Sequence, residues 1–312
     1  MLYYAYSDYL KQKYGEKVYK LPINLPVTCP NRINGRGCAF CAGAGTGFEA
    51  MNSSNGITKQ LEKTQELIIR KYHASKYIAY FQNYTNTFLP VEEFRIYLQE
   101  AAAFPNIVEI SVSTRPDCIT KDYLDVMQEI REQTGIEMTV ELGLQTANYH
   151  TLEKIDRGHG LAEFIDAVLM IKQYSGFQIC THVILNLPGD TFADARETAR
   201  ILTALGVDIV KLHSLYISPD TKLYEWYQED KITLCSKEEY FERVITFLEQ
   251  IPETVAVERL FSRIPEKDAV FSNWGCSWWK LKDELLQKME TENRYQGKEC
   301  HYLNGAALGR LK

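Results

Sequence analysis

The alternation of two hydrophobic patterns along most of the chain constrains its fold more than any other feature. Short apolar runs typical of strands are followed repeatedly by longer segments with apolar residues three and four positions apart, which is typical of helices. Strands that alternate with helices of this length predict βαβ units and a parallel sheet. The six predicted strands are residues 18–27, 77–82, 107–114, 136–144, 177–187 and 207–216. The predicted helices are residues 57–73, 91–104, 121–133, a short helix around 150, 161–174 and 191–205.

Six consecutive βα units indicate an α/β fold, either an open doubly wound sheet or a partial barrel, and periodicity alone does not choose between them. After Lys222 the pattern becomes mainly helical, with predicted helices at residues 237–250 and 279–291 and one strand-like run at residues 254–260. We therefore expect one βα domain with an N-terminal extension over residues 1–222. A mainly helical C-terminal extension, residues 223–312, is expected to pack on it.

Composition excludes several classes of protein. The chain of 312 residues is 45% hydrophobic and 24% charged, as in ordinary globular proteins, which excludes a disordered or low-complexity chain. It has no apolar run of about 18 residues, so no membrane span is expected, and its N-terminus lacks a secretory signal, so a cytoplasmic location is expected. The net charge of −6 argues against a chain coated by nucleic acid, although a local basic face is compatible with it.

Three of the eight cysteines, Cys29, Cys38 and Cys41, fall in one loop directly after the first predicted strand. In parallel α/β folds, ligands bind at this edge of the sheet. A structural zinc ion needs four ligands, and the nearest fourth candidate, His73, lies far along a helix. A [4Fe–4S] cluster held by three thiolates, with one iron left open for an outside molecule, fits the C-x8-C-x2-C spacing better. Burial as small apolar residues is the remaining alternative.

The cysteine segment and six further motifs together resemble the radical S-adenosylmethionine (radical SAM) enzymes. Within them the order and spacing resemble the YhcC/YtqA-like branch, which is related to the radical SAM domain of the Elongator catalytic subunit. The motifs are TCPNR…GCAFC, YFQNYTNT, STRPD, ELGLQT, DRGH, HVILNLPGD and KLHSLY. The resemblance covers most of the chain and implies a partial (β/α)6 barrel.

The same resemblance implies the chemistry. Cys29, Cys38 and Cys41 would hold a [4Fe–4S] cluster, and its open iron would bind S-adenosylmethionine (SAM). One electron, from a donor such as flavodoxin or ferredoxin, would cleave SAM to a 5′-deoxyadenosyl radical that abstracts a hydrogen atom from the substrate. The cofactors carry this chemistry, and the protein positions them and excludes water.

The resemblance also assigns SAM contacts to residues at the ends of the second and third strands. Gln82 and Asn83 would contact the amino group of SAM, often through backbone carbonyls. Arg115 would bind at the SAM or substrate edge, because a guanidinium can form two hydrogen bonds to a carboxylate or phosphate. The structural alternative is an ion pair between Arg115 and Asp117 or Glu141.

Further SAM contacts are expected on the fourth and fifth strands. Strand alternation places Glu141 and Gln145 on one face, where they would hold the ribose or the methionine carboxylate region of SAM. The alternative for Glu141 is a buried salt bridge. Lys154 would face the SAM carboxylate. The segment that begins at His182 would contact the adenine, although Asn186 stands where the resembled motif usually has glycine.

Candidate substrate residues follow from position alone. His159 would bind substrate or cap a helix. Lys211 and His213 alternate inward on the sixth predicted strand, where they would line the substrate mouth, with ordinary strand polarity as the alternative.

The substrate suggested by the resemblance is tRNA, since the Elongator subunit modifies a wobble uridine. The residues after 222 leave too little chain for the acetyltransferase domain of that subunit, so we expect a different transformation of the C5 substituent of the uridine. A small metabolite or a peptide is the alternative substrate. The non-enzymatic alternative is an iron–sulfur or zinc module that acts as a sensor.

Overall fold

The computed structural model describes residues 1–33, 35–43 and 50–311. Seven parallel strands form one sheet in the order β1-β2-β3-β4-β5-β6-β8, and β7 pairs with β9 in a separate antiparallel ribbon. The strands are β1 (Val18–Asn24), β2 (Lys76–Gln82), β3 (Ile107–Thr114), β4 (Glu137–Gln145), β5 (Phe177–Ile184), β6 (Ile209–His213), β7 (Tyr216–Ile217), β8 (Ala256–Arg259) and β9 (Phe271–Ser272).

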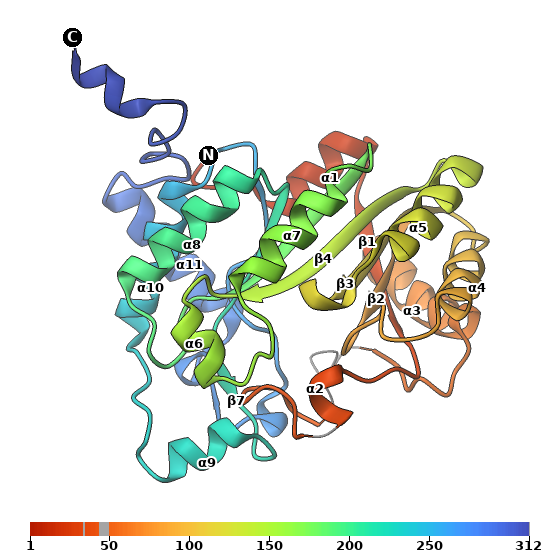
Figure 1. Ribbon diagram of the computed structural model, residues 1–312, viewed down its shortest axis with the longest axis horizontal. Helices are drawn as coiled ribbons and strands as arrows, with labels where there is room; N and C mark the ends of the chain where they lie inside the picture. The colour runs from red at the N-terminus through yellow and green to blue at the C-terminus, as the bar shows by residue number, and fades with distance from the viewer. Residues whose placement is uncertain (34, 44–49, 312) are drawn as a thin grey trace.

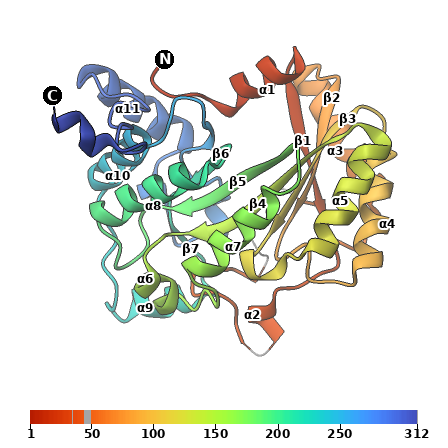
Figure 2. The same ribbon diagram turned by 45° about the horizontal axis from the view of Figure 1, so that its top comes forward.

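Helices connect successive strands and cover the outer face of the curled sheet (Figure 1, Figure 2). The α-helices are α1 (Tyr6–Tyr14), α2 (Pro30–Ile33), α3 (Ile57–Tyr72), α4 (Val91–Ala102), α5 (Lys121–Thr134), α6 (Tyr149–Lys154), α7 (Leu161–Ile171), α8 (Phe192–Leu205), α9 (Lys222–Gln228), α10 (Lys237–Gln250) and α11 (Trp278–Thr291). The short 3-10 helices are η1 (Pro116–Cys118), η2 (Glu266–Asp268), η3 (Asn273–Gly275) and η4 (Ala306–Leu311).

Local sequence sets where these helices begin and end. Helix α8 begins after Thr191, whose amide and hydroxyl both donate to the Asp194 carboxylate (2.7 Å each). It ends at Gly206, which adopts a left-handed conformation with φ of 60° that glycine reaches at little cost. Such paired signals explain why the predicted and observed helices agree closely.

The sheet is a partial barrel, as the resemblance to radical SAM enzymes implied, and β1 and β8 are its two edges. All six predicted strands are present, and they follow chain order across the sheet. The seventh strand, β8, comes from the predicted strand-like run at residues 254–260 and pairs with β6. The part of the chain after the expected domain boundary at residue 222 therefore supplies an edge strand of the sheet. The boundary itself stays a prediction.

The two faces of the sheet differ in chemistry. Leu142 and Leu144 on β4 are buried in the main apolar core, whereas Glu141, Gly143 and Gln145 line a hollow inside the barrel. This is the alternation predicted for the strand.

Helix α1 closes the end of the barrel at which the strands begin, at the top of both views (Figure 1, Figure 2). Its Tyr6 and Leu10 pack against Ile78, Cys180 and Ile209 from inside the sheet. The interior therefore opens toward the carboxyl ends of the strands, where α2 and the cysteine loop lie, far from both termini (Figure 1, Figure 2). Among the described residues, no helix is long and apolar enough to cross a membrane.

Candidate active site

Backbone hydrogen bonds hold the cysteine loop in place. The amide of Arg32 donates to the carbonyl of Cys29 (2.8 Å), and the amide of Cys41 donates to the carbonyl of Cys38 (2.9 Å). The amide of Ala39 donates to the carbonyl of Ile155 (2.8 Å), which ties the loop to the end of α6. The three cysteines thus meet in one hollow at the carboxyl edge of the sheet, which we call the cysteine pocket.

Each cysteine sulfur faces a different guanidinium group. Arg115 Nη1 lies 3.8 Å from Cys29 Sγ. Arg157 Nη1 lies 3.5 Å from Cys38 Sγ, and Arg32 Nη2 lies 3.4 Å from Cys41 Sγ.

The hydrogen bond from Arg32 favours the thiolate form of Cys41, the form that binds iron. At Cys41, burial raises the pKa of the thiol and the hydrogen bond from Arg32 opposes that rise. Three cations around three thiolates suit an anionic cluster.

The spacing of the sulfurs argues against a single tetrahedral ion. Two sulfurs bound to one zinc ion at about 2.3 Å are at most about 4.6 Å apart. Within the described part of the chain, the three cysteines do not form a group whose ligand atoms all lie within 4.8 Å of one another. The wider spacing fits a cluster in which each thiolate binds its own iron.

Five of the residues predicted to contact SAM line the cysteine pocket. They are Asn83, Arg115, Glu141, Gln145 and His182.

Unpartnered polar atoms show where a ligand fits in this pocket. The buried Asn83 Oδ1 and Thr85 Oγ1, both just after β2, have no hydrogen-bond partner among the described residues. Buried polar groups are normally paired, so these two atoms suit the polar groups of a bound cofactor such as SAM.

A second hollow, the inner cavity, adjoins the cysteine pocket. The two hollows share Phe40, Tyr80, Gln145 and His182 in their linings. The predicted residues Gln82, Lys211 and His213 line the inner cavity. Gln82 Nε2 and His213 Nε2 are buried there without a hydrogen-bond partner among the described residues.

Two predicted residues lie outside both hollows. Lys154 is exposed on α6 and lines neither of them. His159 is buried, and its ring nitrogens lie 3.1 Å from the carbonyl of Gly160 and 3.2 Å from the carbonyl of Gly143. It faces a separate surface hollow. The roles assigned to these two residues therefore stay predictions, and their positions do not support them.

Arg115 and Glu141 form the ion pairs that were the structural alternatives to their SAM contacts, and those contacts stay predictions. Arg115 donates two hydrogen bonds to Asp117, from Nε (2.8 Å) and Nη2 (2.6 Å), so two of its three guanidinium nitrogens are already paired. The third nitrogen, Nη1, faces Cys29. The Glu141 carboxylate lies 2.6 Å from Lys20 and 3.2 Å from Lys211.

Glu141 belongs to a buried ion network that forms the floor of the site. Glu258 completes it, 2.6 Å from Lys20 and 2.9 Å from Lys211, so two carboxylates balance two ammonium groups. Burial alone would raise the pKa of Glu141, but Lys20, Lys211 and His182 outweigh burial and hold the pKa well below its usual value.

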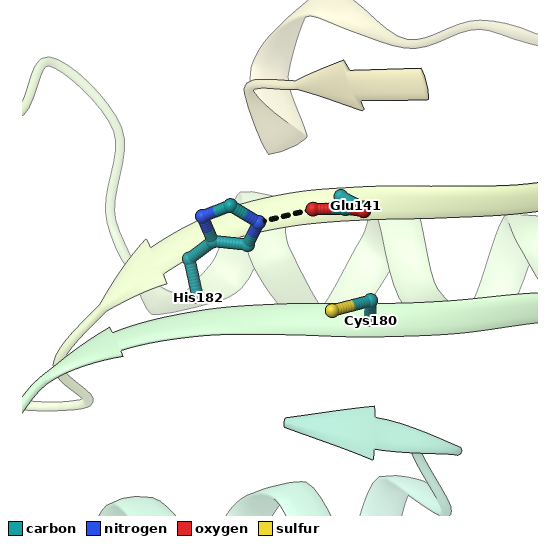
Figure 3. Close-up of side chains that lie close together, drawn as sticks. All are labelled: Glu141, Cys180 and His182. Atoms are coloured by element: carbon teal, nitrogen blue, oxygen red, sulfur yellow. Dashed lines mark hydrogen bonds and ion pairs between the residues drawn. The ribbon is translucent and has the colours of Figure 1, made fainter. Parts of the chain in front are cut away.

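His182 also contacts this floor. Figure 3 shows its ring directed from β5 toward Glu141 on the neighbouring β4, with Nε2 at 2.6 Å from the carboxylate. Cys180 lies close to both. Burial raises the pKa of Cys180 well above its usual value, and ammonium groups already neutralise Glu141, so this trio lacks the free anionic ligands that a metal ion needs.

Sequence reasoning missed the role of Arg157, which lines the cysteine pocket. Its Nη2 donates to the carbonyl of Gly143 (2.7 Å) while Nη1 faces Cys38. A Cβ at Gly143 would lie 2.8 Å from that Nη2, so glycine is required for the guanidinium to reach this position. The DRGH motif, which contains both Arg157 and His159, is the sequence signal that marks this residue.

The fold and the cysteine pocket define the class of protein, an iron–sulfur enzyme built on a partial βα barrel. The chain belongs to the radical SAM superfamily: residues 23–202 match the description "Radical SAM superfamily", and residues 207–291 match "Radical_SAM C-terminal domain". The [4Fe–4S] cluster and SAM are the cofactors of this family, and the cysteine pocket fits both.

Full-length relatives are similar along most of the chain. The uncharacterized protein YtqA of Bacillus subtilis is 32% identical over 95% of this chain and 92% of its own. Protein YhcC of Escherichia coli is 34% identical, with 96% and 94% covered. These matches confirm the resemblance to the YhcC/YtqA-like branch.

Similarity to tRNA-modifying proteins is weaker and partial. The tRNA uridine(34) acetyltransferase of Methanocaldococcus infernus is 28% identical to this chain over a match that covers 51% of this chain and 29% of that protein. The solved structure of Elp3 from the same organism has the same fold, with a TM-score of 0.69 at 19% identity, and the match covers 89% of this chain and 64% of that one.

Proposed function

We propose that this radical SAM enzyme modifies the C5 substituent of the wobble uridine in tRNA. The observation that carries the proposal is the direct connection between the cysteine pocket and the inner cavity through four shared residues. A substrate in the inner cavity would lie beside SAM, as hydrogen abstraction requires. The sequence similarity to tRNA uridine(34) acetyltransferases supports uridine as that substrate.

The residues that line the cysteine pocket would hold both cofactors. Cys29, Cys38 and Cys41 would bind the cluster, while Asn83, Thr85 and Gln145 would contact SAM. When bound, the cluster supplies the electron that cleaves SAM to methionine and a 5′-deoxyadenosyl radical.

The chain itself positions the reactants and excludes water. Arg32, Arg115 and Arg157 fix the three sulfurs. Phe40 lines both the cysteine pocket and the inner cavity, and Ile184 and Leu215 add apolar surface to the inner cavity. An apolar lining of this kind protects a reactive radical from side reactions.

The inner cavity offers groups suited to a base. Tyr80, His182 and His213 present aromatic faces, and the rings of His182 and His213 stack with centroids 5.3 Å apart. Gln82 and His213 each offer an unpartnered nitrogen for hydrogen bonds. Stacking combined with hydrogen bonds to base edges is how proteins recognise an unpaired base.

An anaerobic assay tests the proposal. The cluster would be reconstituted, reduced with dithionite and supplied with SAM and with tRNA from a strain that lacks the gene. We expect 5′-deoxyadenosine to rise with tRNA, and mass spectrometry of digested tRNA to show a changed wobble nucleoside. Product formation indifferent to tRNA would direct the search to a small metabolite, and a loaded cluster that never cleaves SAM would favour a sensor.

A further inference from the structure

Few groups around the inner cavity are suited to accept a proton. The described residues that line it include no carboxylate and no cysteine. Burial alone would lower the pKa of Lys211, but Glu141 and Glu258 outweigh burial and hold that pKa well above its usual value, so this side chain is an ammonium group. The side chains of the lining that can act as bases at neutral pH are therefore the two histidines, His182 and His213.

Glu141 orients one of these two rings. His182 Nε2 lies 2.6 Å from the Glu141 carboxylate, a distance typical of a hydrogen bond to a charged group. Because the carboxylate is ionised and can only accept, Nε2 carries the hydrogen, and Nδ1 of the neutral ring is left as a proton acceptor. Figure 3 shows Nδ1 on the side of the ring that is turned away from Glu141. Nδ1 forms no hydrogen bond with any residue that the structure describes.

The position of His182 suits proton transfer beside a radical. Its side chain lines both the cysteine pocket and the inner cavity. It is 18% exposed, whereas the side chain of Glu141 behind it is 0% exposed. A substrate in the inner cavity that lies beside SAM therefore also lies beside this ring.

The charges around His182 allow the ring to gain a proton and to be stabilised once it has done so. The groups that face it are Glu141 on β4, Lys211 and His213 on β6, and Glu258 on β8. Burial, and next the charge of Lys211, lowers the pKa of His182, so the ring is neutral at pH 7. When the ring takes a proton, the contacting carboxylate stabilises the imidazolium, as in other carboxylate–histidine pairs.

His213 lacks this support. Its Nε2 is buried and has no hydrogen-bond partner among the described residues. Burial, and next the charge of Arg259, lowers its pKa well below the usual value. A proton on His213 would thus be opposed by Arg259 without a contacting carboxylate to balance it, so His182 is the better base of the two.

We infer that His182 is the catalytic base that takes a proton from the substrate in the inner cavity, with Glu141 as its positioning residue. This inference rests on the proposed function, because it takes the inner cavity as the site of the substrate. It also names the class of reaction: dehydrogenation at a carbon atom of the C5 substituent that bears a hydroxyl or an amino group.

The atoms and electrons of this reaction balance. The 5′-deoxyadenosyl radical takes a hydrogen atom from that carbon and becomes 5′-deoxyadenosine. Nδ1 of His182 then takes the proton of the adjacent O–H or N–H group, and the one remaining electron returns to the oxidised cluster. One C–H bond and one O–H or N–H bond break, and a C=O or C=N double bond forms. SAM is the oxidant that is consumed, and the proton passes to water after the product leaves.

The first test compares two products in the wild type and in His182→Gln. Glutamine keeps an N–H group for Glu141 but has no basic nitrogen. With tRNA from a strain that lacks the gene, we expect the ratio of changed wobble nucleoside to 5′-deoxyadenosine to fall about 100-fold, since a general base contributes roughly 10²–10⁴-fold. His150→Gln is the matched control. This histidine is exposed on α6 and lines neither hollow, so the variant should keep the wild-type ratio.

Two further readouts separate a base from a structural histidine. In the wild type, formation of the changed nucleoside should fall as pH decreases through the pKa of His182, which burial and Lys211 hold below its ordinary value of 6.5, because a protonated base accepts no further proton. In His182→Ala, imidazole added to the solution should restore the changed nucleoside, and more basic imidazoles should restore it better. This second variant also serves if His182→Gln folds poorly.

The third readout needs neither cluster nor activity. Nuclear magnetic resonance of the cluster-free full chain, labelled with ¹⁵N at histidine, reports which ring nitrogen carries the hydrogen. At neutral pH we expect a protonated Nε2 and an unprotonated Nδ1 for the signals that His182→Gln lacks. The opposite tautomer would overturn the inference, because Nδ1 would then have no lone pair to accept a proton.

The outcomes are distinct. A wild-type enzyme that changes no tRNA nucleoside overturns the proposed function and, with it, this inference. If the wild type works and His182→Gln keeps its product ratio, the proposed function stands and the base is wrong. If both products fall together in His182→Gln, the residue serves cofactor binding and the base is again wrong. A lower ratio with rescue by imidazole supports the inference as stated.

Discussion

Arg157 and Cys38 face each other across the cysteine pocket, with Nη1 of the guanidinium 3.5 Å from Sγ. The same side chain donates to the carbonyl of Gly143 on β4 (2.7 Å). One buried residue after α6 therefore connects the cysteine loop to the strand that carries Glu141 and Gln145. A cation fixed beside a cluster ligand stabilises the more negative, reduced state of the cluster.

Replacement of Arg157 by Gln should lower the midpoint potential of the cluster, because a positive charge near a ligand sulfur is lost. It should also destabilise the fold by about 1–3 kcal/mol, since the Gly143 carbonyl loses its donor. A redox titration followed by electron paramagnetic resonance measures the potential. Arg157→Lys is the control, because it keeps the charge, and it should recover part of the shift. An unchanged potential in Arg157→Gln would contradict this role.

The second prediction concerns Gly158, which has a φ of 77° and packs against the cysteine loop. A Cβ at this position would lie 2.4 Å from Oδ1 of Asn31, a residue whose amide donates to Cys38 Sγ at 3.5 Å. Gly158→Ala should therefore strain the backbone by about 1–3 kcal/mol and also displace the loop. The expected result is a lower content of iron and sulfide after reconstitution.

Gly15 provides the matched control for that experiment. It has nearly the same φ, 78°, but a Cβ there would meet no atom within 4 Å. Gly15→Ala should destabilise the chain in urea by a similar backbone cost and leave the cluster content at the wild-type level. Equal iron loss in both variants would show that general destabilisation, and not contact with Asn31, explains the effect.

The elements and the site differ in how far the sequence predicts them. Strand 107–114 and helix 237–250 were predicted with the observed bounds, because local periodicity determines both. The strand-like run 254–260 was recognised, but its place beside β6 was not, since strand pairing depends on contacts distant in sequence.

Within the site, strand alternation and the family resemblance placed Glu141, Gln145 and His182 in one site, and all three line the cysteine pocket. Lys154 and Arg157 show what a periodic pattern does not report. They are three residues apart, yet Lys154 is exposed on α6, whereas Arg157 lies beyond the end of the helix and is buried. The turn at Asp156, with a φ of 52°, reverses the chain there, and no periodic pattern reports such a turn.

The third prediction concerns the charge balance beneath the site. Glu141→Gln leaves Lys20 and Lys211 with Glu258 as their remaining carboxylate partner within this network, so a buried positive charge is uncompensated. We expect a loss of about 3–5 kcal/mol in the free energy of unfolding, measured with urea. Removing one ammonium group as well, in Glu141→Gln with Lys211→Met, should restore part of the loss. If the double variant is less stable than Glu141→Gln, charge balance is not the reason.

The fourth prediction is a pH dependence that originates at His159. Burial, and next the charge of Arg157, lowers its pKa from 6.5 to about 4. Between these two values the unfolded chain binds a proton that the folded chain does not, so stability falls as pH decreases from about 6.5 to 4. The contribution is at most about 3 kcal/mol. Urea unfolding of the cluster-free protein at pH 5 and 7.5 should show a smaller difference for His159→Gln than for the wild type.

The fifth prediction tests the cysteine assignment. Each of the three variants Cys29→Ala, Cys38→Ala and Cys41→Ala should lose the cluster and abolish formation of 5′-deoxyadenosine. Each sulfur faces its own guanidinium, so the two remaining thiolates cannot replace the missing cluster ligand. Cys276→Ala is the control: this half-buried cysteine packs against the main apolar core, away from the cysteine pocket, so iron content and SAM cleavage should stay at wild-type levels. Full SAM cleavage by any one of the first three variants would exclude that residue as a ligand and reopen the search for the third thiolate among the remaining cysteines.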